Sequence, residues 1–291
     1  MPSSTPESVA GRPGALRRLR RHRGAVLGAI ILAGLAGVAA MAPWLSPVDP
    51  IKTAPREALK GPGAAHVLGT DQYGRDVLSR VLHGARISLV VGLVSVSIAL
   101  ALGVPVGLAA GYRAGRLDAL LMRVMDVMLA FPGVLLALAI VSVLTPSLAN
   151  LMIAVGLAAV PTYARLVRGS VLAAKQNLYV EAARAVGCRD VLVVRRYILP
   201  NVVAPVIVTA TLGMGTAILS AAALSFLGLG SQPPQPEWGR MLSEGRDYLR
   251  EAWWISTFPG VGIMLTVLAM NLLGDGLRDV LDPRLQHERP S

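Results

Sequence analysis

The sequence predicts an all-α, polytopic membrane protein with six transmembrane helices. Apolar residues make up 54% of the 291 residues and charged residues only 15%, whereas soluble proteins carry about 25% charge. The mean hydropathy is +0.58, and six segments approach the roughly 20 apolar residues that a helix needs to cross a bilayer. These segments are 24–45, 87–111, 124–144, 151–167, 202–229 and 258–277.

The first segment, 24–45, follows the basic tail 1–23, which is also the arrangement of a secretory signal peptide. Its apolar core is longer than the roughly 7–15 residues of a signal sequence, so we expect a retained transmembrane helix. In the second segment, small residues at four-residue steps let another helix approach closely; they are Gly103, Gly107 and Gly111. The fourth segment, 151–167, is short and contains Pro161 and Arg165, which leaves its inner end undefined.

Positive charge orients the predicted helices, because the cytoplasmic loops of membrane proteins carry an excess of Lys and Arg. With six spans the two termini lie on the same side. Of the 28 Lys and Arg residues, 19 fall on that side or at its membrane boundary. We therefore expect the tails 1–23 and 278–291 and the loops 112–123 and 168–200 in the cytoplasm.

The loops 46–86 and 230–257 then lie outside. The four tryptophans fall near this outer interface, where an indole is stable with one end in water; they are Trp44, Trp238, Trp253 and Trp254. In 76–89 the apolar residues fall near one face, which predicts a helix on the membrane surface. Three basic residues are available there for the headgroups of membrane lipid: Arg75, Arg80 and Arg86. Packing against the protein's own helix ends is the alternative interpretation.

Polar groups are scarce within the predicted spans. Ionisable residues inside a bilayer are costly, and no acidic residue occupies the middle of any span, which disfavours an ion-coupled carrier. Four aspartates near the cytoplasmic boundary are expected to cap helices or pair with arginine: Asp118, Asp126, Asp275 and Asp279. Small polar residues offer either a watery pathway or hydrogen bonds between helices, and the candidates are Thr209, Thr211, Thr216, Ser220 and Asn271.

Nothing in the sequence predicts catalysis. A phosphate-binding loop ends in Gly-Lys-Ser or Gly-Lys-Thr, and the only lysines, Lys52, Lys60 and Lys175, follow other residues. A single cysteine, Cys188, excludes a disulfide within the chain and a thiolate metal cluster, and the histidines are scattered without ligand spacing. We therefore expect no catalytic residue, no metal site and no cofactor in this chain. Nucleic acid is disfavoured as a partner, because the basic residues lie between hydrophobic spans.

The most informative stretch is 181–200, EAARAVGCRDVLVVRRYILP, a basic segment between apolar runs. Small alanines let a short helix sit deep in a partner's groove, Gly187 breaks that helix, and Pro200 restarts the chain as a membrane helix. The pattern resembles the cytoplasmic coupling loop of bacterial ABC-import permeases, and the matching residues are Glu181, Ala182, Ala183, Gly187, Leu199 and Pro200. Four basic residues of this stretch can contact acidic groups of an ATPase or lipid phosphates: Arg184, Arg189, Arg195 and Arg196. Alternatively, their positive charge serves only to keep this loop on the cytoplasmic side.

Three further stretches extend the resemblance, namely LGTDQYGRDVLSR (68–80), FLGLGSQPPQPEWGRML (226–242) and LLGDGLRDVLDPR (272–284). With the coupling loop they resemble the second permease subunit of dipeptide, oligopeptide and nickel ABC importers. Tyr197 stands where that family often has His, and a more highly charged run is usual where this chain has Lys-Gln-Asn at 175–177. These departures concern details of ATPase docking rather than the fold.

The resemblance implies a type I ABC-importer permease fold, with a core domain over 87–284, in the bacterial inner membrane. It implies import of di- or oligopeptides, with this chain forming half of the pathway and transmitting ATPase motion through 181–200. The implied partners are a second, similar permease, an extracytoplasmic substrate-binding protein, and two ATP-binding subunits or one two-domain ATPase that bind ATP and Mg²⁺. The alternatives are a membrane scaffold or assembly protein and, after it, an ion-coupled secondary transporter.

Overall fold

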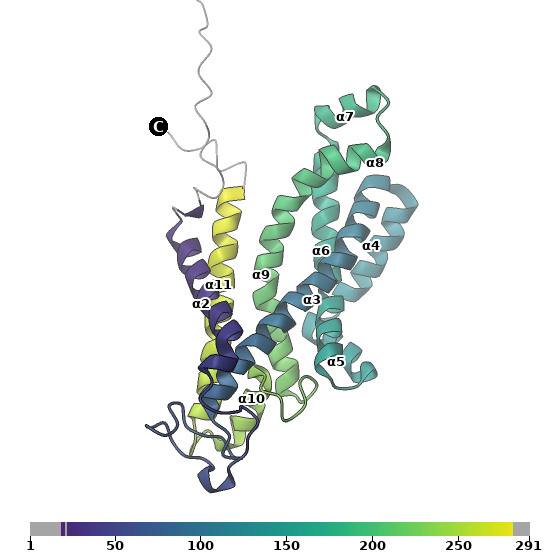
Figure 1. The fold of residues 1–291 in the computed structure, drawn as a ribbon. Helices are drawn as coiled ribbons and strands as arrows, with labels where there is room; N and C mark the ends of the chain where they lie inside the picture. Colours follow the sequence, from purple (N-terminus) through teal and green to yellow (C-terminus); the bar gives the residue numbers. More distant parts are fainter. Residues whose placement is uncertain (1–18, 21, 282–291) are drawn as a thin grey trace, which may run out of the picture.

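A computed structural model describes residues 19–20 and 22–281, and in this part of the chain nearly every element is a helix. Five helices are long and apolar enough to cross a membrane, and a bent pair of shorter helices makes six if it is counted as one span. The five are α2 (Arg23–Leu45), α3 (Val77–Arg113), α6 (Leu148–Lys175), α9 (Leu199–Phe226) and α11 (Trp254–Leu281). The expected all-α fold is confirmed (Figure 1).

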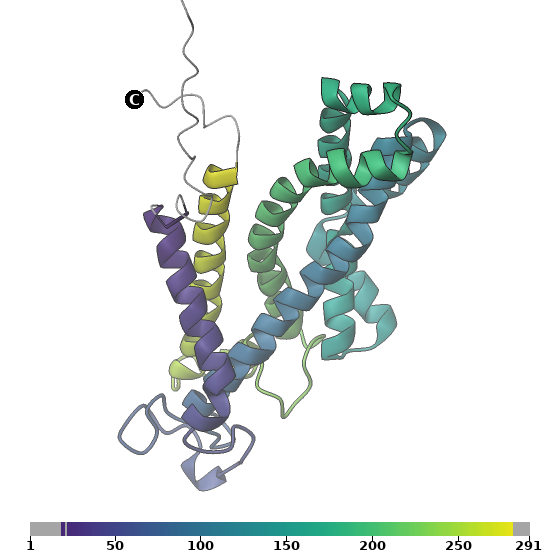
Figure 2. The same cartoon turned by 45° about the horizontal axis from the view of Figure 1, so that its top comes forward.

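Helix α3 joins two elements that the sequence predicts separately. A surface helix over 76–89 and a span from residue 87 are expected, whereas the structure has a single helix of 37 residues. The Asp76 side chain caps its first turn by accepting a hydrogen bond of 2.8 Å from the Ser79 N–H. At 1.5 Å per residue such a helix is about 55 Å long, which a bilayer accommodates only if the helix tilts or projects from it. Figure 2 shows α3 running obliquely across its neighbours.

The third predicted span is broken. Helices α4 (Gly115–Leu129) and α5 (Gly133–Leu144) meet at an angle of 91°, so the straight helix expected over 124–144 is wrong. The expected loop 112–123 is also mostly helical. Pro132 lies at the break, and a proline has no backbone N–H and disfavours the helical conformation of the residue before it. The bend therefore has a local cause that the apolar pattern conceals.

Three long helices extend beyond the predicted spans. Helix α6 starts before the expected segment 151–167 and continues to Lys175, and α11 both starts earlier and ends later than the expected 258–277. Helix α9 begins earlier than the expected 202–229 and ends at Phe226. Each of the three contains an internal proline, namely Pro161, Pro205 and Pro259. A proline removes one hydrogen bond without ending a helix when tertiary packing holds its neighbours in place.

Glycines bring α3 and α6 into close contact. A Cβ atom on Gly103 would lie 2.9 Å from the Val160 carbonyl oxygen, and one on Gly111 would lie 2.8 Å from the Val171 Cβ atom. Any larger residue at these positions would push the two helices apart. The close approach expected from the glycine steps is confirmed.

Helix α2 lies along α11, on the side of the molecule away from α4 and α5 (Figures 1 and 2). A Cβ atom on Gly28 would lie 2.6 Å from the Ala269 carbonyl oxygen, so small residues also set this contact. His22 accepts a hydrogen bond of 3.1 Å from the Ala25 N–H, and its Nε2 atom lies 3.1 Å from an Asp279 carboxylate oxygen. Asp279 is therefore paired, although with histidine rather than the expected arginine.

A buried ionic cluster holds the segment between α2 and α3 against α10 (Trp238–Gly245), at the end of the molecule that we call the α10 end (Figure 1). The Arg75 guanidinium lies 2.6 Å from both Asp71 and Glu244, and that of Arg80 lies 3.0 Å from Glu244. The two arginine side chains are only 3% and 1% exposed. Of the two interpretations of Arg75 and Arg80, packing within the protein is therefore confirmed and contact with lipid headgroups is not, whereas Arg86 is exposed.

Two of the four tryptophans are structural. The Trp238 indole N–H donates to the Val81 carbonyl at 3.1 Å, and that of Trp254 donates to the Thr70 carbonyl at 3.0 Å. Both side chains are buried, whereas Trp44 and Trp253 are exposed. Only Trp44 and Trp253 expose an indole at the surface, so fewer tryptophans can contact the membrane interface than the sequence predicts.

His66 bridges two carboxylates at the α10 end. Its Nδ1 atom lies 2.9 Å from Asp76 and its Nε2 atom lies 3.2 Å from Glu57. The hydrogen bond with Asp76, and after it that with Glu57, raises the pKa of His66 above its ordinary value, against the opposing effect of burial. Only the imidazolium donates from both nitrogens. Lys60, 3.3 Å from Glu57, is a further charge at this cluster.

We expect this bridge to make stability depend on pH. Because the pKa of His66 is raised in the folded state, its contribution is complete below about pH 6.5 and is lost as the pH rises through the raised value. Wild-type chain should lose thermal stability relative to His66→Gln as the pH rises above about 6.5 and through the raised pKa of His66. His83→Gln is the matched control, because His83 contacts only the Ser79 carbonyl oxygen, at 3.0 Å. Equal pH dependence in wild type and His66→Gln would contradict the prediction.

Candidate functional site: coupling segment and cavity

The segment 178–200, which we call the coupling segment, lies at the opposite end of the molecule from α10 (Figure 1). It contains α7 (Leu178–Ala185), α8 (Asp190–Val193) and a π-helical turn (Val194–Ile198) that leads directly into α9. The candidate residues Glu181, Ala182, Ala183 and Arg184 therefore lie on a short helix.

Gly187 ends helix α7 in a left-handed conformation. Its φ angle is +81°, its N–H donates to the Arg184 carbonyl at 2.9 Å, and the Cys188 N–H donates to the Ala183 carbonyl at 3.0 Å. These two bonds form a Schellman motif, which a residue with a Cβ atom disfavours. Glycine is required here for its backbone conformation, because no described part of the chain beyond its neighbours lies within 4 Å of an added Cβ atom.

Pro200 lies in the first turn of the membrane helix α9, as expected, but no loop separates this helix from the coupling segment. The helical path is continuous from Asp190 to Phe226, with the π-helical turn just before Leu199 and Pro200. In that turn the Leu199 N–H donates to the Val194 carbonyl, five residues earlier. A proline cannot donate the next bond of a regular helix, and a wider turn accommodates the mismatch. The coupling segment and the wall of the cavity described below are thus parts of one helical path.

The two faces of the coupling segment differ. Its inner face forms a hydrophobic cluster within the chain, made of Val180, Ala183, Val193, Ile198 and Val202. Ala183 therefore packs inside this protein, contrary to the expectation that it fits a partner's groove, whereas Ala182 is exposed. Large apolar side chains cover the outer face: Leu178, Val186 and Val191 are 82%, 79% and 79% exposed. Such a patch beside charged residues marks a protein interaction site.

Tyr112, at the end of α3, attaches the coupling segment to that helix. Its hydroxyl donates to the Asp190 carboxylate, and its ring lies 5.2 Å from the Arg184 guanidinium carbon and 5.5 Å from the Lys175 Nζ atom. Lys175 also donates to the Tyr112 carbonyl at 2.8 Å, which stabilises the C-terminus of α3. The sequence interpretation missed this anchor, because the Tyr112 and Asp190 partners are 78 residues apart and no local pattern connects them.

Ion pairs join α4 to α6 near the same end. Arg168 makes two hydrogen bonds to Asp118, of 2.6 and 2.7 Å, and Arg165 pairs with Asp126 at 2.5 Å. Arginine pairing, one of the two expected roles of Asp118 and Asp126, is confirmed. Because each carboxylate has a cation, neither is a free ion-coupling group.

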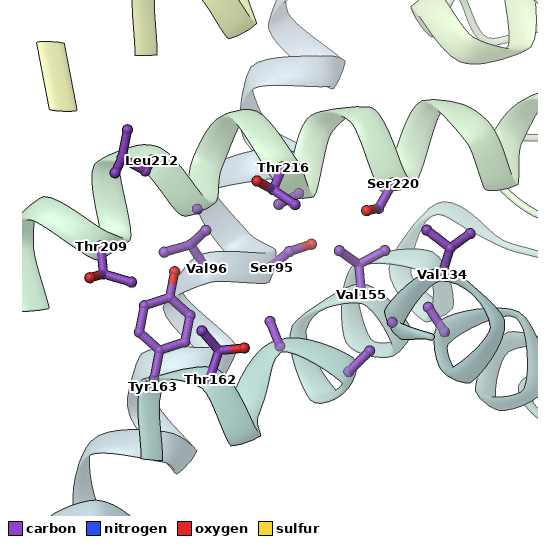
Figure 3. A pocket seen from close by; sticks show the side chains of 16 residues that line it. Ser95, Val96, Val134, Val155, Thr162, Tyr163, Thr209, Leu212, Thr216 and Ser220 are labelled. Atoms are coloured by element: carbon purple, nitrogen blue, oxygen red, sulfur yellow. The ribbon is translucent and has the colours of Figure 1, made fainter. Parts of the chain in front are cut away.

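A cavity of about 450 Å³ lies where α3, α5, α6 and α9 meet (Figure 3). Three of the five candidate pathway residues line it: Thr209, Thr216 and Ser220. Thr211 lies outside the lining and donates to the Ile207 carbonyl at 2.9 Å, and Asn271 lies on α11, also outside. The sequence could not make this distinction, because the orientation of each residue depends on which helices surround α9.

The lining of the cavity carries hydroxyl groups and no charged side chain. Ser95, Thr162 and Tyr163 come from α3 and α6 and face the hydroxyls of α9 (Figure 3). The remaining lining residues are apolar or glycine. A mostly apolar cavity of this size with a few convergent polar groups has the character of a small-molecule site. Among the residues that the structure describes, no group of three or more potential ligands is placed to hold a metal ion.

Membrane-spanning helices around an uncharged cavity, with exposed apolar side chains on a helical segment at one end, are typical of the membrane subunit of a transporter. Residues 103–287 match the family described as binding-protein-dependent transport system inner membrane component. Residues 14–62 match the N-terminal TM domain of oligopeptide transport permease C. The chain belongs to the family of binding-protein-dependent transport system inner membrane components.

Curated relatives resemble nearly the whole chain. It is 47% identical to the dipeptide transport system permease protein DppC of Alkalihalophilus pseudofirmus, over 94% of this chain and 90% of that protein. Identity to the di/tripeptide permease DppC of Pseudomonas aeruginosa is 48%, over 91% and 90%. Identity to the glutathione permease GsiD of Escherichia coli is 48%, over 93% and 89%.

A solved structure supports the fold. The chain is similar to a chain in inward-facing structures of the MetNI methionine ABC transporter, with a TM-score of 0.59 and 20% identity, over 70% of this chain and 97% of that one. Fold and family together make this chain a permease subunit of an ABC importer, a multi-pass protein of the inner membrane. ATP hydrolysis occurs in separate subunits, so the chain is not an enzyme. The family implies ATPase and substrate-binding partners, and neither alternative interpretation is supported.

Proposed function

We propose that this chain forms half of the translocation pathway of a bacterial importer for di- or oligopeptides. Its nearly full-length identity of 47–48% to dipeptide and di/tripeptide permeases is the observation that carries the substrate class. The other half of the pathway belongs to a second, similar permease. ATP and Mg²⁺ are bound by two ATPase subunits or one two-domain ATPase, and a substrate-binding protein delivers the peptide from outside. This chain itself holds no cofactor.

The coupling segment receives the motion of the ATPase. Its exposed apolar residues, with Glu181 and Ala182 beside them, offer the docking surface. Tyr112 fixes the segment to α3, and the helical path 190–226 continues into the part of α9 that contains Thr209 and Ser220. Displacement of the segment therefore moves two walls of the cavity, which is the requirement for switching access from one side to the other.

The test is uptake by the reconstituted complex. Proteoliposomes that contain both permeases and the ATPase should accumulate labelled Ala-Ala when binding protein is outside and ATP inside. This chain reconstituted alone should neither hydrolyse ATP nor move Ala-Ala in response to a proton gradient. Proton-driven uptake by the chain alone, or failure of the intact complex to transport peptides, would overturn the proposed function.

Cys188 reports the orientation of the chain. We propose that both termini and the coupling segment are cytoplasmic, as the distribution of Lys and Arg supports. A membrane-impermeant maleimide should label Cys188, a half-buried residue and the only cysteine, in inverted vesicles and not in intact spheroplasts. In a Cys188→Ser background, Val186→Cys (79% exposed) should label like Cys188, and Val67→Cys (60% exposed) should label in spheroplasts. The reverse pattern would invert the proposed topology.

A further inference from the structure

Tyr163 is the most unusual group in the cavity. Its side chain is 2% exposed, and its hydroxyl makes no hydrogen bond with another described residue. The hydroxyl oxygen is not among the fully enclosed oxygens that lack a partner, so it is accessible from the cavity that Tyr163 lines. The side chain extends from α6 toward Thr209 and α9, among the other hydroxyls (Figure 3).

Two glycines make room for this tyrosine. A Cβ atom on Gly103 of α3 would lie 2.8 Å from the Tyr163 Cβ atom, and a Cβ atom on Gly213 of α9 would collide with the Tyr163 hydroxyl oxygen. Tyr163 thus fills the space where three helices cross, and its hydroxyl remains available at the cavity rather than bonded to a helix. The hydroxyl points toward α9, whose helical path continues from the coupling segment.

We propose that the cavity is a transit site for the uncharged, hydrogen-bonding part of a passing peptide, and that the Tyr163 hydroxyl is its specificity-determining contact. This inference rests on the proposed function. The amide groups of a peptide match the hydroxyls of Thr209, Thr216 and Ser220. A charged peptide side chain would lose its hydration there and meet no counter-charge in this half of the pathway. The cavity therefore favours neutral side chains.

The first experiment compares Tyr163→Phe with wild type in the reconstituted complex. The packed ring is retained, and the lost hydroxyl has no hydrogen-bond partner among residues 19–20 and 22–281. Recovery and thermal stability of the complex should therefore be unchanged. Ala-Ala uptake should fall about three- to tenfold, the value of one hydrogen bond to the peptide. Unchanged uptake, or a lower recovery of the complex with normal uptake per complex, would overturn the inference and leave the proposed function standing.

A second pair of variants tests the wall of the cavity. Thr216→Val and Thr211→Val remove the same hydroxyl from the same helix, but only Thr216 lines the cavity. We expect only Thr216→Val to slow Ala-Ala uptake.

A charge placed in the cavity tests its preference for neutral side chains. Thr216→Asp should raise the ratio of Ala-Lys to Ala-Ala uptake about tenfold over wild type, since a carboxylate pairs with the lysine. All measurements use the same binding protein, so its own substrate preference does not change the ratio between wild type and variant. An unchanged ratio, or equal effects of the two valine variants, would contradict the inference.

Discussion

Replacing Gly187 with valine is expected to lower ATP-driven uptake by about tenfold and to lower the ATPase activity that loaded binding protein stimulates by a similar factor. The φ angle of +81° is costly for a β-branched side chain, by about 1–2 kcal/mol. The Schellman motif would open and misplace the outer face of α7. The membrane helices do not include this residue, so insertion and pairing with the second permease should be normal.

Gly187→Asn is the matched control, because asparagine tolerates the left-handed conformation. It should retain most of the uptake, since no described residue would contact the first atom of an added side chain at this position. If valine and asparagine are equally inactive, contact with the ATPase rather than backbone conformation selects glycine. Normal uptake with Gly187→Val would instead mean that the segment is an ordinary surface helix.

Glu181→Lys extends the same test to charge. Glu181 lies in the first turn of α7, where a negative side chain interacts with the helix dipole by roughly 0.3–1 kcal/mol. Reversal of the charge should reduce uptake and stimulated ATPase activity together, and Glu181→Gln should reduce them less. Loss of uptake with fully stimulated ATPase activity would argue against a role in coupling.

Glu244→Gln is expected to prevent recovery of stable protein. It removes the carboxylate shared by Arg75 and Arg80, whose guanidinium groups are almost completely buried. The two buried guanidinium groups would then share a single carboxylate, that of Asp71, which lies 2.6 Å from Arg75 and 3.6 Å from Arg80. Removing one partner from a buried ionic group costs about 3–5 kcal/mol, a large part of the stability of a typical domain. Thermal unfolding of the detergent-purified complex, together with its yield, measures this effect.

Two comparisons make this second prediction specific. Asp247→Asn breaks the exposed pair with Arg246, at 3.3 Å and with side chains 56% and 75% exposed, and should change stability by less than about 1 kcal/mol. Combining Glu244→Gln with Arg80→Met leaves Asp71 with Arg75 alone in place of two buried arginines, and should restore part of the lost stability. A Glu244→Gln complex as stable as the Asp247→Asn complex would show that the buried cluster is not essential.

Local patterns in the sequence were sufficient for the membrane class, the apolar segments and the family. Long apolar runs identify spanning helices because a bilayer requires them, and the glycine steps in α3 identify a close contact because only small residues permit it. The glycine at 187 likewise identifies the end of α7. Each of these features depends on a residue and its neighbours in the chain.

Tertiary structure alone decided the features that depend on distant partners. Arg75 and Glu244 are 169 residues apart, so the periodic apolar pattern left lipid contact and internal packing of the arginine both open, and the fold buries it. The anchoring of Asp190 by Tyr112, and the division of the α9 hydroxyls into cavity and non-cavity groups, arise for the same reason. Periodicity specifies which face of a helix is apolar, but the helix that packs against that face determines whether a polar residue is buried, paired or left open to a cavity.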